Sequence, residues 1–274
     1  MKFKSTIIAG LALLLFFSCA VNPFTGKKTM ALIPNSQLLP MAFAQYDQFL
    51  TENKVVSNTQ DAEMIKRVGQ RIAVAAERWL NANGYQGYLK DYKWEYNLVD
   101  DKTVNAWCMP GGKIVFYTGI LPIAANETGV AAIMGHEVAH ALANHGQQRM
   151  SAGLIQQLGA VGVAVGTGNK DPQVQQQWMQ AYGAATTIGG MLPFSRNHES
   201  QSDEIGLRLM AIAGYNPDEA AELWKRMQAN SGGQAPPEFL STHPSNETRI
   251  ANLTKWAPEA KKEAAKFGIT SFRE

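Results

Sequence analysis

The chain has 274 residues, 45% of them hydrophobic, so it is long and apolar enough to bury a sizeable core. Its formal net charge of +2 would fall to zero if Lys2 and Lys4 were removed with a leading segment. This balance argues against the basic field of a nucleic-acid-binding protein, and length alone allows one large domain or two small ones.

The N-terminal residues, MKFKSTIIAGLALLLFFSCA, join a basic start to an apolar run from Ile7 to Phe17. That run is shorter than the roughly 18 to 20 residues that cross a bilayer as a helix, so we predict a signal peptide over residues 1–18. Cys19 follows the run directly and resembles the lipid-attachment cysteine of bacterial lipoproteins. The resemblance implies a periplasmic protein anchored to the outer membrane through Cys19. A cleaved soluble form and an uncleaved anchored form are the alternatives.

The next segments change pattern twice. Residues 19–35 carry Pro, Gly and Asn around a short apolar stretch, which suits a tether and an edge segment. Helical patterning begins near Ser36 and is strong over residues 61–80. Between residues 92 and 120 apolar side chains alternate instead, with a break at Pro110-Gly111-Gly112. This alternation predicts short antiparallel strands.

From Asn126 onward the sequence is mostly helical. Asn126 or Thr128 is expected to cap a helix that reaches His145, and Asp171-Pro172 starts another helix. Further helices are expected over residues 197–213, from Pro217 and from Pro244. The stretch GLIQQLGAVGVAVG is too short and too broken by glycine to be expected to span a membrane, and contact with a lipid surface stays open. The predicted fold is α+β, mostly helical, with a small antiparallel sheet.

The segment IMGHEVAHAL carries the main chemical signal. In an α-helix, four residues turn about 400°, so His136 and His140 project from one stripe and can share a zinc ion. Glu137 lies about 100° from His136, which places its carboxylate beside the ion as a base for a bound water. Two solvated surface histidines are the alternative. The flanking residues are apolar on most sides, however, so the helix is predicted to be buried.

A catalytic zinc usually takes a third protein ligand. His145 is nine residues from His136 and faces the opposite side of a helix, so it is expected to be a cation at the helix end. Glu199 is the better candidate, since it forms an i, i+4 pair with Asp203 on a helix that also has a core face. Asp203 would orient a ligand histidine. An exposed acidic pair is the alternative, and His198 is expected on the surface.

These motifs resemble the HtpX, BepA and CAAX prenyl protease family of gluzincins. The resemblance rests on HEVAH and on S-R-x-x-E-x-x-S-D-x-x-G at 195–206, with NAWCMPGGKIVFYTGIL before them and THPSNETRI after them. It implies a zincin-like metallopeptidase domain with one zinc ion per chain, held by His136, His140 and Glu199. We place this domain at residues 36–258, followed by a C-terminal tail at 259–274.

The resemblance also implies a mechanism. Glu137 would take a proton as water attacks a peptide carbonyl and would then protonate the leaving amine. His243, expected at the N-cap before Pro244, is the candidate second donor to the oxyanion, with Arg249 adding positive charge. His243 as a fourth zinc ligand at rest is a further hypothesis, and an exposed loop histidine and a surface arginine are the alternatives. Cys108 is interpreted as a small buried apolar group.

We expect an extended substrate to pair with one predicted strand through backbone hydrogen bonds, a mode that favours unfolded proteins. The strand is formed by Lys113, Ile114, Val115, Phe116 and Tyr117. A purely structural strand is the alternative. The predicted function is cleavage of unfolded or misassembled outer-membrane proteins, with outer-membrane assembly machinery as a candidate partner and no nucleic acid. The competing function is a chaperone-like assembly factor in which zinc is structural or regulatory. A redox or other hydrolytic enzyme fits poorly, because the chain has no G-x-S-x-G element.

Overall fold

A computed structural model describes residues 19–230, 238–243 and 247–274. The predicted signal peptide and Pro244 therefore lie outside the described residues. The chain divides into two compact units, Met1–Leu38 with Asn144–Glu199, and Leu39–Ala143 with Ser200–Glu274. The single domain predicted over residues 36–258 is thus interrupted by a segment that belongs to another unit.

The second unit contains most of the helices. Its long α3 begins after Thr59, whose side chain accepts a hydrogen bond from the Ala62 backbone N–H. The helical pattern over residues 61–80 gives this helix a core face, because Ile65, Val68 and Ile72 are fully buried, whereas Val74 is 56% exposed. The helices of this unit are α2 (Asn35–Glu52), whose first residues belong to the other unit, α3 (Gln60–Ala82), the 3-10 turn η1 (Thr118–Ile120), α4 (Leu121–Ala124), α5 (Glu127–Leu142), the part of α8 (Leu192–Ile212) from Ser200 onward, α9 (Glu219–Asn230), α10 (Glu238–Thr242) and α11 (Glu247–Ala265).

The sheet of the second unit has the order β3-β4-β6-β5, with bounds Val55–Val56, Glu95–Val99, Lys113–Tyr117 and Ala106–Met109. β5 and β6 form the predicted antiparallel hairpin, and Gly111 and Gly112 supply the positive φ that its turn requires. β4 and β6 are parallel. The α+β, mostly helical fold class is confirmed, with one parallel pair among the antiparallel ones.

The position of β6 corrects the predicted substrate strand. β6, formed by Lys113 to Tyr117, pairs with β4 on one side and with β5 on the other. Its backbone groups are therefore used within the sheet, and no extended peptide can add to it. β3 and β5 are the two edge strands of this sheet.

The first unit consists of a small ribbon and a helical segment. β1 (Cys19–Val21) and β2 (Lys28–Met30) are antiparallel, and the helices are α6 (His145–Thr167), α7 (Pro172–Thr186), the π-helix η2 (Thr187–Met191) and the start of α8 (Leu192–Ile212). Gln147 donates a side-chain hydrogen bond to the Ile33 carbonyl at 2.6 Å, and the Leu32 N–H donates to the Ser151 hydroxyl at 3.0 Å. The predicted tether therefore packs on α6.

Two predicted boundaries are wrong. The helix expected to reach His145 ends at Leu142, because Asn144 takes a left-handed conformation with φ 57° and a new helix starts at His145. The predicted tail at residues 259–274 begins inside α11, which ends at Ala265. The last residues of the chain pack on the second unit, where the Arg273 N–H donates to the Gly214 carbonyl at 2.9 Å.

Candidate metal centre

Helix α5 places three ionisable side chains in the interior. Asn126 caps the helix by accepting a hydrogen bond from the Gly129 N–H at 2.8 Å, as predicted. His136, Glu137 and His140 are each no more than 5% exposed. The prediction that this helix is buried is confirmed. Since burying such groups is unfavourable without compensation, the interior must supply partners for them.

Two glycines allow α5 and α8 to approach closely. A Cβ added at Gly135 would lie 2.8 Å from the Gly206 carbonyl oxygen, and a Cβ added at Gly206 would lie 2.9 Å from the His136 backbone nitrogen. These separations leave no room for a side chain. The contact brings Asp203, one turn before Gly206 on α8, beside His136. Gly206 lies in the motif at 195–206, but its spacing there gives no sign of this contact.

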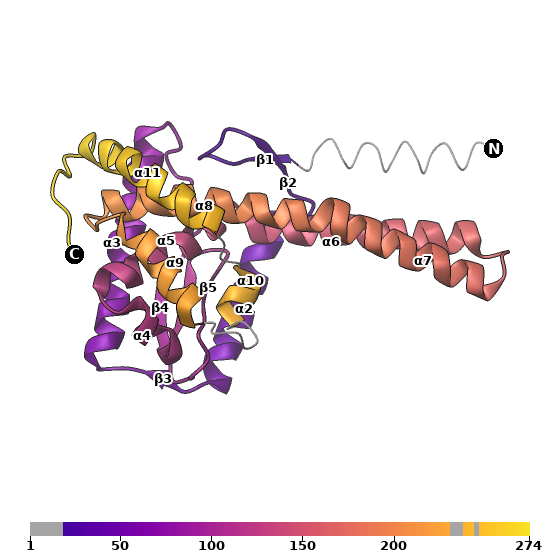
Figure 1. The fold of residues 1–274 in the computed structure, drawn as a ribbon, viewed down its shortest axis with the longest axis horizontal. Helices are drawn as coiled ribbons and strands as arrows, with labels where there is room; N and C mark the ends of the chain where they lie inside the picture. The colour runs from indigo at the N-terminus through magenta and orange to yellow at the C-terminus, as the bar shows by residue number, and fades with distance from the viewer. Residues whose placement is uncertain (1–18, 231–237, 244–246) are drawn as a thin grey trace. The chain divides into compact units, whose positions relative to one another are not determined.

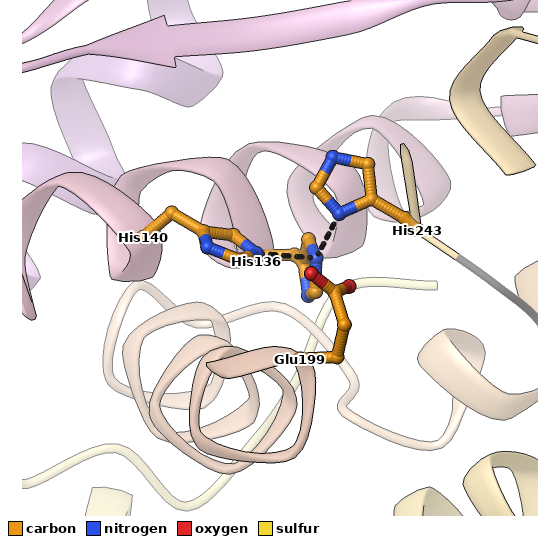
Figure 2. Close-up of side chains that lie close together, drawn as sticks. All are labelled: His136, His140, Glu199 and His243. Carbon is orange, nitrogen blue, oxygen red and sulfur yellow. Dashed lines mark hydrogen bonds between the residues drawn. The ribbon is translucent and has the colours of Figure 1, made fainter. Parts of the chain in front are cut away.

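Four predicted residues gather at one point. Ligand atoms of His136, His140, Glu199 and His243 all lie within 4.8 Å of one another, and all four side chains are buried (Figure 2). The His136 Nε2 atom is 3.1 Å from His140 Nε2 and 3.2 Å from His243 Nδ1. Glu199 ends the first unit within α8, which continues without a break to Asp203. The structure thus brings together the predicted ligands and one more histidine.

Asp203 holds the ring of His136. Its Oδ1 atom is 2.9 Å from His136 Nδ1, so we assign the ring proton to Nδ1 and leave Nε2 as the atom that faces the cluster. Burial raises the pKa of Asp203, but the Arg249 guanidinium and the His136 ring lower it by more, so the pKa lies below its ordinary value. The carboxylate is therefore ionised and able to orient the ring.

Arg249 has a different role from the predicted one. Its Nε and Nη2 atoms donate to the two oxygens of Asp203 at 2.7 and 2.6 Å. Its guanidinium also lies 3.5 Å from the ring centroid of Trp224. This paired, 6% exposed guanidinium compensates the Asp203 charge instead of facing substrate. Trp224 was not identified from sequence, where a tryptophan on an amphipathic helix is an ordinary core residue.

His243 lies between the cluster and Glu137. Its Nε2 atom is 3.5 Å from Glu137 Oε1, and its Nδ1 atom faces His136. It follows α10, with its N–H donating to the Phe239 carbonyl at 2.8 Å, and the predicted N-cap role before Pro244 falls on residues outside the described ranges. Its side chain is nevertheless within the site.

The two remaining histidines are buried in the first unit, where neither was expected. The rings of His145 and His198 stack with centroids 4.0 Å apart, and His198 Nε2 lies 3.2 Å from the Gln148 side-chain oxygen. Burial, followed by the charge of Arg149, lowers the pKa of His198 to about 4. His145 thus lies in the interior at the start of α6 and not at the end of α5, and His198 is no surface residue.

The donor set fits a zinc ion. Zinc takes imidazole nitrogens and carboxylate oxygens at about 2.0 to 2.2 Å in tetrahedral geometry, which places neighbouring ligand atoms roughly 3.3 Å apart. The nitrogen pairs at 3.1 and 3.2 Å are close to this separation. His136, His140 and Glu199 would hold the ion, and His243 would add a fourth nitrogen.

A family model supports this chemistry independently. The model named Peptidase family M48 matches residues 59–257, most of the chain. The chain belongs to peptidase family M48. Membership of this family confirms the family resemblance seen in the motifs. It also confirms the predicted class of metalloendopeptidase, with zinc as the cofactor.

Each curated M48 relative aligns with this chain over only part of its own length. The mitochondrial metalloendopeptidase OMA1 of Saccharomyces cerevisiae is 37% identical over 179 residues, covering 63% of this chain and 49% of that protein. Human OMA1 is 26% identical over 256 residues, covering 90% of this chain and 47% of its own length. The beta-barrel assembly-enhancing protease of Escherichia coli is 28% identical over 164 residues, covering 57% and 32%. The chain spans about half the length of OMA1, and less of the bacterial enzyme.

The relatives contradict the predicted periplasmic location. Relatives from yeasts, a plant and animals are named as mitochondrial enzymes, so the prediction of a periplasmic protein anchored to the outer membrane is wrong on this comparison. The physical reason is that a basic start and a short apolar run direct a chain to a membrane without specifying which one. That segment and the Cys19 side chain lie outside the described residues.

Proposed function

We propose that this M48 chain is a zinc-dependent endopeptidase that hydrolyses peptide bonds in unfolded or misassembled proteins. The observation that carries the proposal is the buried cluster of His136, His140, Glu199 and His243, with Glu137 following His136 on the same helix. A bound zinc ion would supply a Lewis acid that polarises the peptide carbonyl and acidifies water. The chain's own residues supply the remaining steps.

Glu137 moves the proton. Its carboxylate accepts a proton from the attacking water and then donates it to the nitrogen of the leaving amine. A structural metal site has no need of such a residue, so its presence favours catalysis over the competing function of a chaperone-like factor. Asp203 and Arg249 keep the His136 ring in one orientation throughout, since their paired charges hold the Nδ1 proton in place.

The edge strand β5 offers a place for substrate. Helix α5 contacts β5, and the Glu137 charge acts on the Cys108 thiol of this strand. Burial first, and this charge second, raise the pKa of the Cys108 thiol, which is therefore a neutral group and not a nucleophile. A peptide paired with β5 would lie next to the base. Such pairing uses main-chain groups and favours unfolded segments over one specific sequence.

The name of one relative supports a more specific class of substrate. The Escherichia coli relative is named a beta-barrel assembly-enhancing protease, which supports unfolded or misassembled outer-membrane proteins as substrates and their assembly machinery as a partner. The same name also supports the competing function of a chaperone-like assembly factor. The two functions differ in whether the chain must break peptide bonds.

Replacing Glu137 with glutamine separates these functions. The variant should lose about 10²- to 10⁴-fold in the rate of hydrolysis of casein and of an unfolded outer-membrane protein, because it cannot accept the proton. Zinc content, measured by elemental analysis, should stay at the wild-type level. Glu222→Gln, which removes an exposed carboxylate on α9, is the control and should keep full activity. Undiminished hydrolysis by Glu137→Gln would refute the peptidase mechanism.

A further inference from the structure

Helix α6 has the composition of a membrane-active helix. Within the described residues, it is long and apolar enough to cross a membrane by length and composition, and only 11% of its most apolar stretch is buried. It runs continuously through its glycines, although the sequence suggested a broken segment. A core helix of a soluble protein passes the same composition test by being buried, and α6 is not buried.

The exposed side chains of α6 form one apolar stripe. Leu154, Leu158, Val161 and Val165 recur at intervals of four, three and four residues, which places them on the same face of the helix. They are 40%, 63%, 60% and 77% exposed. A continuous run of this kind is more than the scattered apolar residues of an ordinary surface, and it requires a partner.

The packing between α6 and α7 turns this stripe outward. Tyr182 of α7 donates a hydrogen bond to the Gln156 carbonyl of α6 at 3.0 Å, and Gln156 donates to the Thr186 hydroxyl at 2.8 Å. Gln156 is two residues from Leu158, or about 200° around the helix. The two helices run side by side in Figure 1, so the apolar stripe faces away from α7.

Helix α7 is polar on the side away from α6, and its exposed Trp178 and Met179 lie within about 60° of Tyr182 around the helix. Gln173, Gln177 and Gln180 are exposed, and they lie roughly 140° to 200° around the helix from Tyr182, which faces α6. The two helices therefore form a layer with one apolar side and one glutamine side. A segment that spans a bilayer would have to bury these amides in hydrocarbon at high cost, whereas a layer on the bilayer surface leaves them in water.

The charges of this segment are confined to its ends. Between residues 145 and 198 the charged side chains are Arg149, Lys170, Asp171 and Arg196, with a net charge of +2 from three cations and one anion. All four are exposed. No charge interrupts residues 150–169, and the cations at the ends suit the anionic headgroups of a lipid surface.

We propose that α6 and α7 form a membrane-docking layer, with the apolar stripe of α6 in the boundary between headgroups and acyl chains and the glutamine face of α7 in water. Residues 19–35 pack on α6 in the same unit, and in the sequence they directly follow the apolar run at residues 7–17. The docking layer and the segment that follows the N-terminal apolar run in the sequence therefore lie in one unit.

The test is hydrogen–deuterium exchange on the full chain, with and without vesicles of phosphatidylcholine and phosphatidylglycerol. Vesicles should slow exchange across residues 150–166 and leave α5 unchanged. The variant Leu158→Gln/Val161→Gln/Val165→Gln should lose this slowing, because glutamine keeps helix propensity and removes the apolar stripe. Gln173→Ala/Gln177→Ala/Gln180→Ala, on the opposite side of the layer, is the matched control and should retain it.

Circular dichroism verifies that both variants keep their helices. Exchange that is unaffected by vesicles in the wild-type chain would overturn the proposal. Slowing that appears without vesicles and grows with protein concentration would also overturn it, since a second copy of the chain would then cover the stripe. Slowing that requires phosphatidylglycerol supports the contribution of the cations at the ends, and slowing on phosphatidylcholine alone supports docking through the apolar stripe.

Discussion

At the scale of single residues, the centre depends on how each imidazole is held. His136 is fixed through Nδ1 by Asp203, and Asp203 is in turn paired with Arg249. This chain of contacts keeps one nitrogen of His136 directed at His140 and His243 (Figure 2). A ring held in this way loses little orientational freedom when it binds an ion, so affinity depends on residues that never touch the metal.

Replacing Asp203 with asparagine should therefore weaken zinc binding by about 10- to 100-fold. The amide cannot carry the charge that balances Arg249, so the buried guanidinium also loses its compensation. Competition with a chelator of known affinity measures the change without relying on activity. Glu204→Gln, on the adjacent half-exposed residue of α8, is the control and should bind zinc as wild type does. Equal affinities for all three proteins would rule out the positioning role.

His243 is the second residue whose role can be decided by substitution. A fourth nitrogen ligand would close the coordination sphere and block water, so His243→Ala should raise the basal hydrolysis of casein several-fold while zinc is retained by the other three ligands. Initial rates and zinc content are measured together. A rate that stays the same or falls would count against inhibition, and a fall with normal zinc content would favour the predicted oxyanion donor.

At the scale of elements, the contact between α5 and α8 decides whether the ligands meet. Both helices carry a glycine at the crossing, and the backbone of one occupies the space where a Cβ of the other would stand. Close packing of this kind tolerates added volume poorly. Helix propensity alone would favour alanine at both positions, so the glycines are explained by the close crossing.

Adding a methyl group at Gly206 should push the helices apart. Gly206→Ala is expected to lower the free energy of unfolding by about 1 to 3 kcal/mol and to weaken zinc binding, since Asp203 moves away from His136. Denaturant unfolding and chelator competition report the two effects. Gly153→Ala in α6, where a Cβ would meet nothing within 4 Å, should be neutral or stabilise by up to about 1 kcal/mol. A stable, zinc-binding Gly206→Ala protein would contradict this role of the crossing.

At the scale of the whole molecule, a charged cluster ties distant segments of the second unit together. Glu127, in the first turn of α5, accepts hydrogen bonds from Arg71 at 2.8 Å and from the Tyr215 hydroxyl at 2.7 Å, and it also pairs with Arg67. The hydrogen bond from Arg67 is the main cause that holds the pKa of Glu127 below its ordinary value. The carboxylate therefore binds its proton less tightly in the folded chain than in the unfolded chain.

This difference predicts how stability varies with pH. The contribution of Glu127 is complete above its unfolded pKa and is lost as pH falls through the lower folded pKa, so stability should decrease on acidification. Glu127→Gln should lose on the order of 1 kcal/mol at neutral pH, and its deficit relative to wild type should shrink in acid. Denaturant unfolding at a series of pH values measures this deficit. A deficit that is independent of pH would show that the carboxylate charge has no role.

Much of the site followed from local pattern. The two histidines of HEVAH must share a helix face because the helical repeat is 3.6 residues, and the same repeat places Glu199 and Asp203 one turn apart. The crossing of α5 with α8, the pairing of Arg249 with Asp203 and the burial of His145 depend on contacts between residues far apart in the chain, which spacing does not encode.

The sequence by itself determined the ligand types, the helical phase of His136 and His140, the base beside them and the zinc chemistry that these imply. Only the tertiary structure decided that β6 is enclosed while β5 is an edge strand, that Arg249 pairs with Asp203, and that α6 presents an apolar face outward. The reason is physical: a helical or strand period specifies which side chains share a face, and packing against other segments specifies what that face meets.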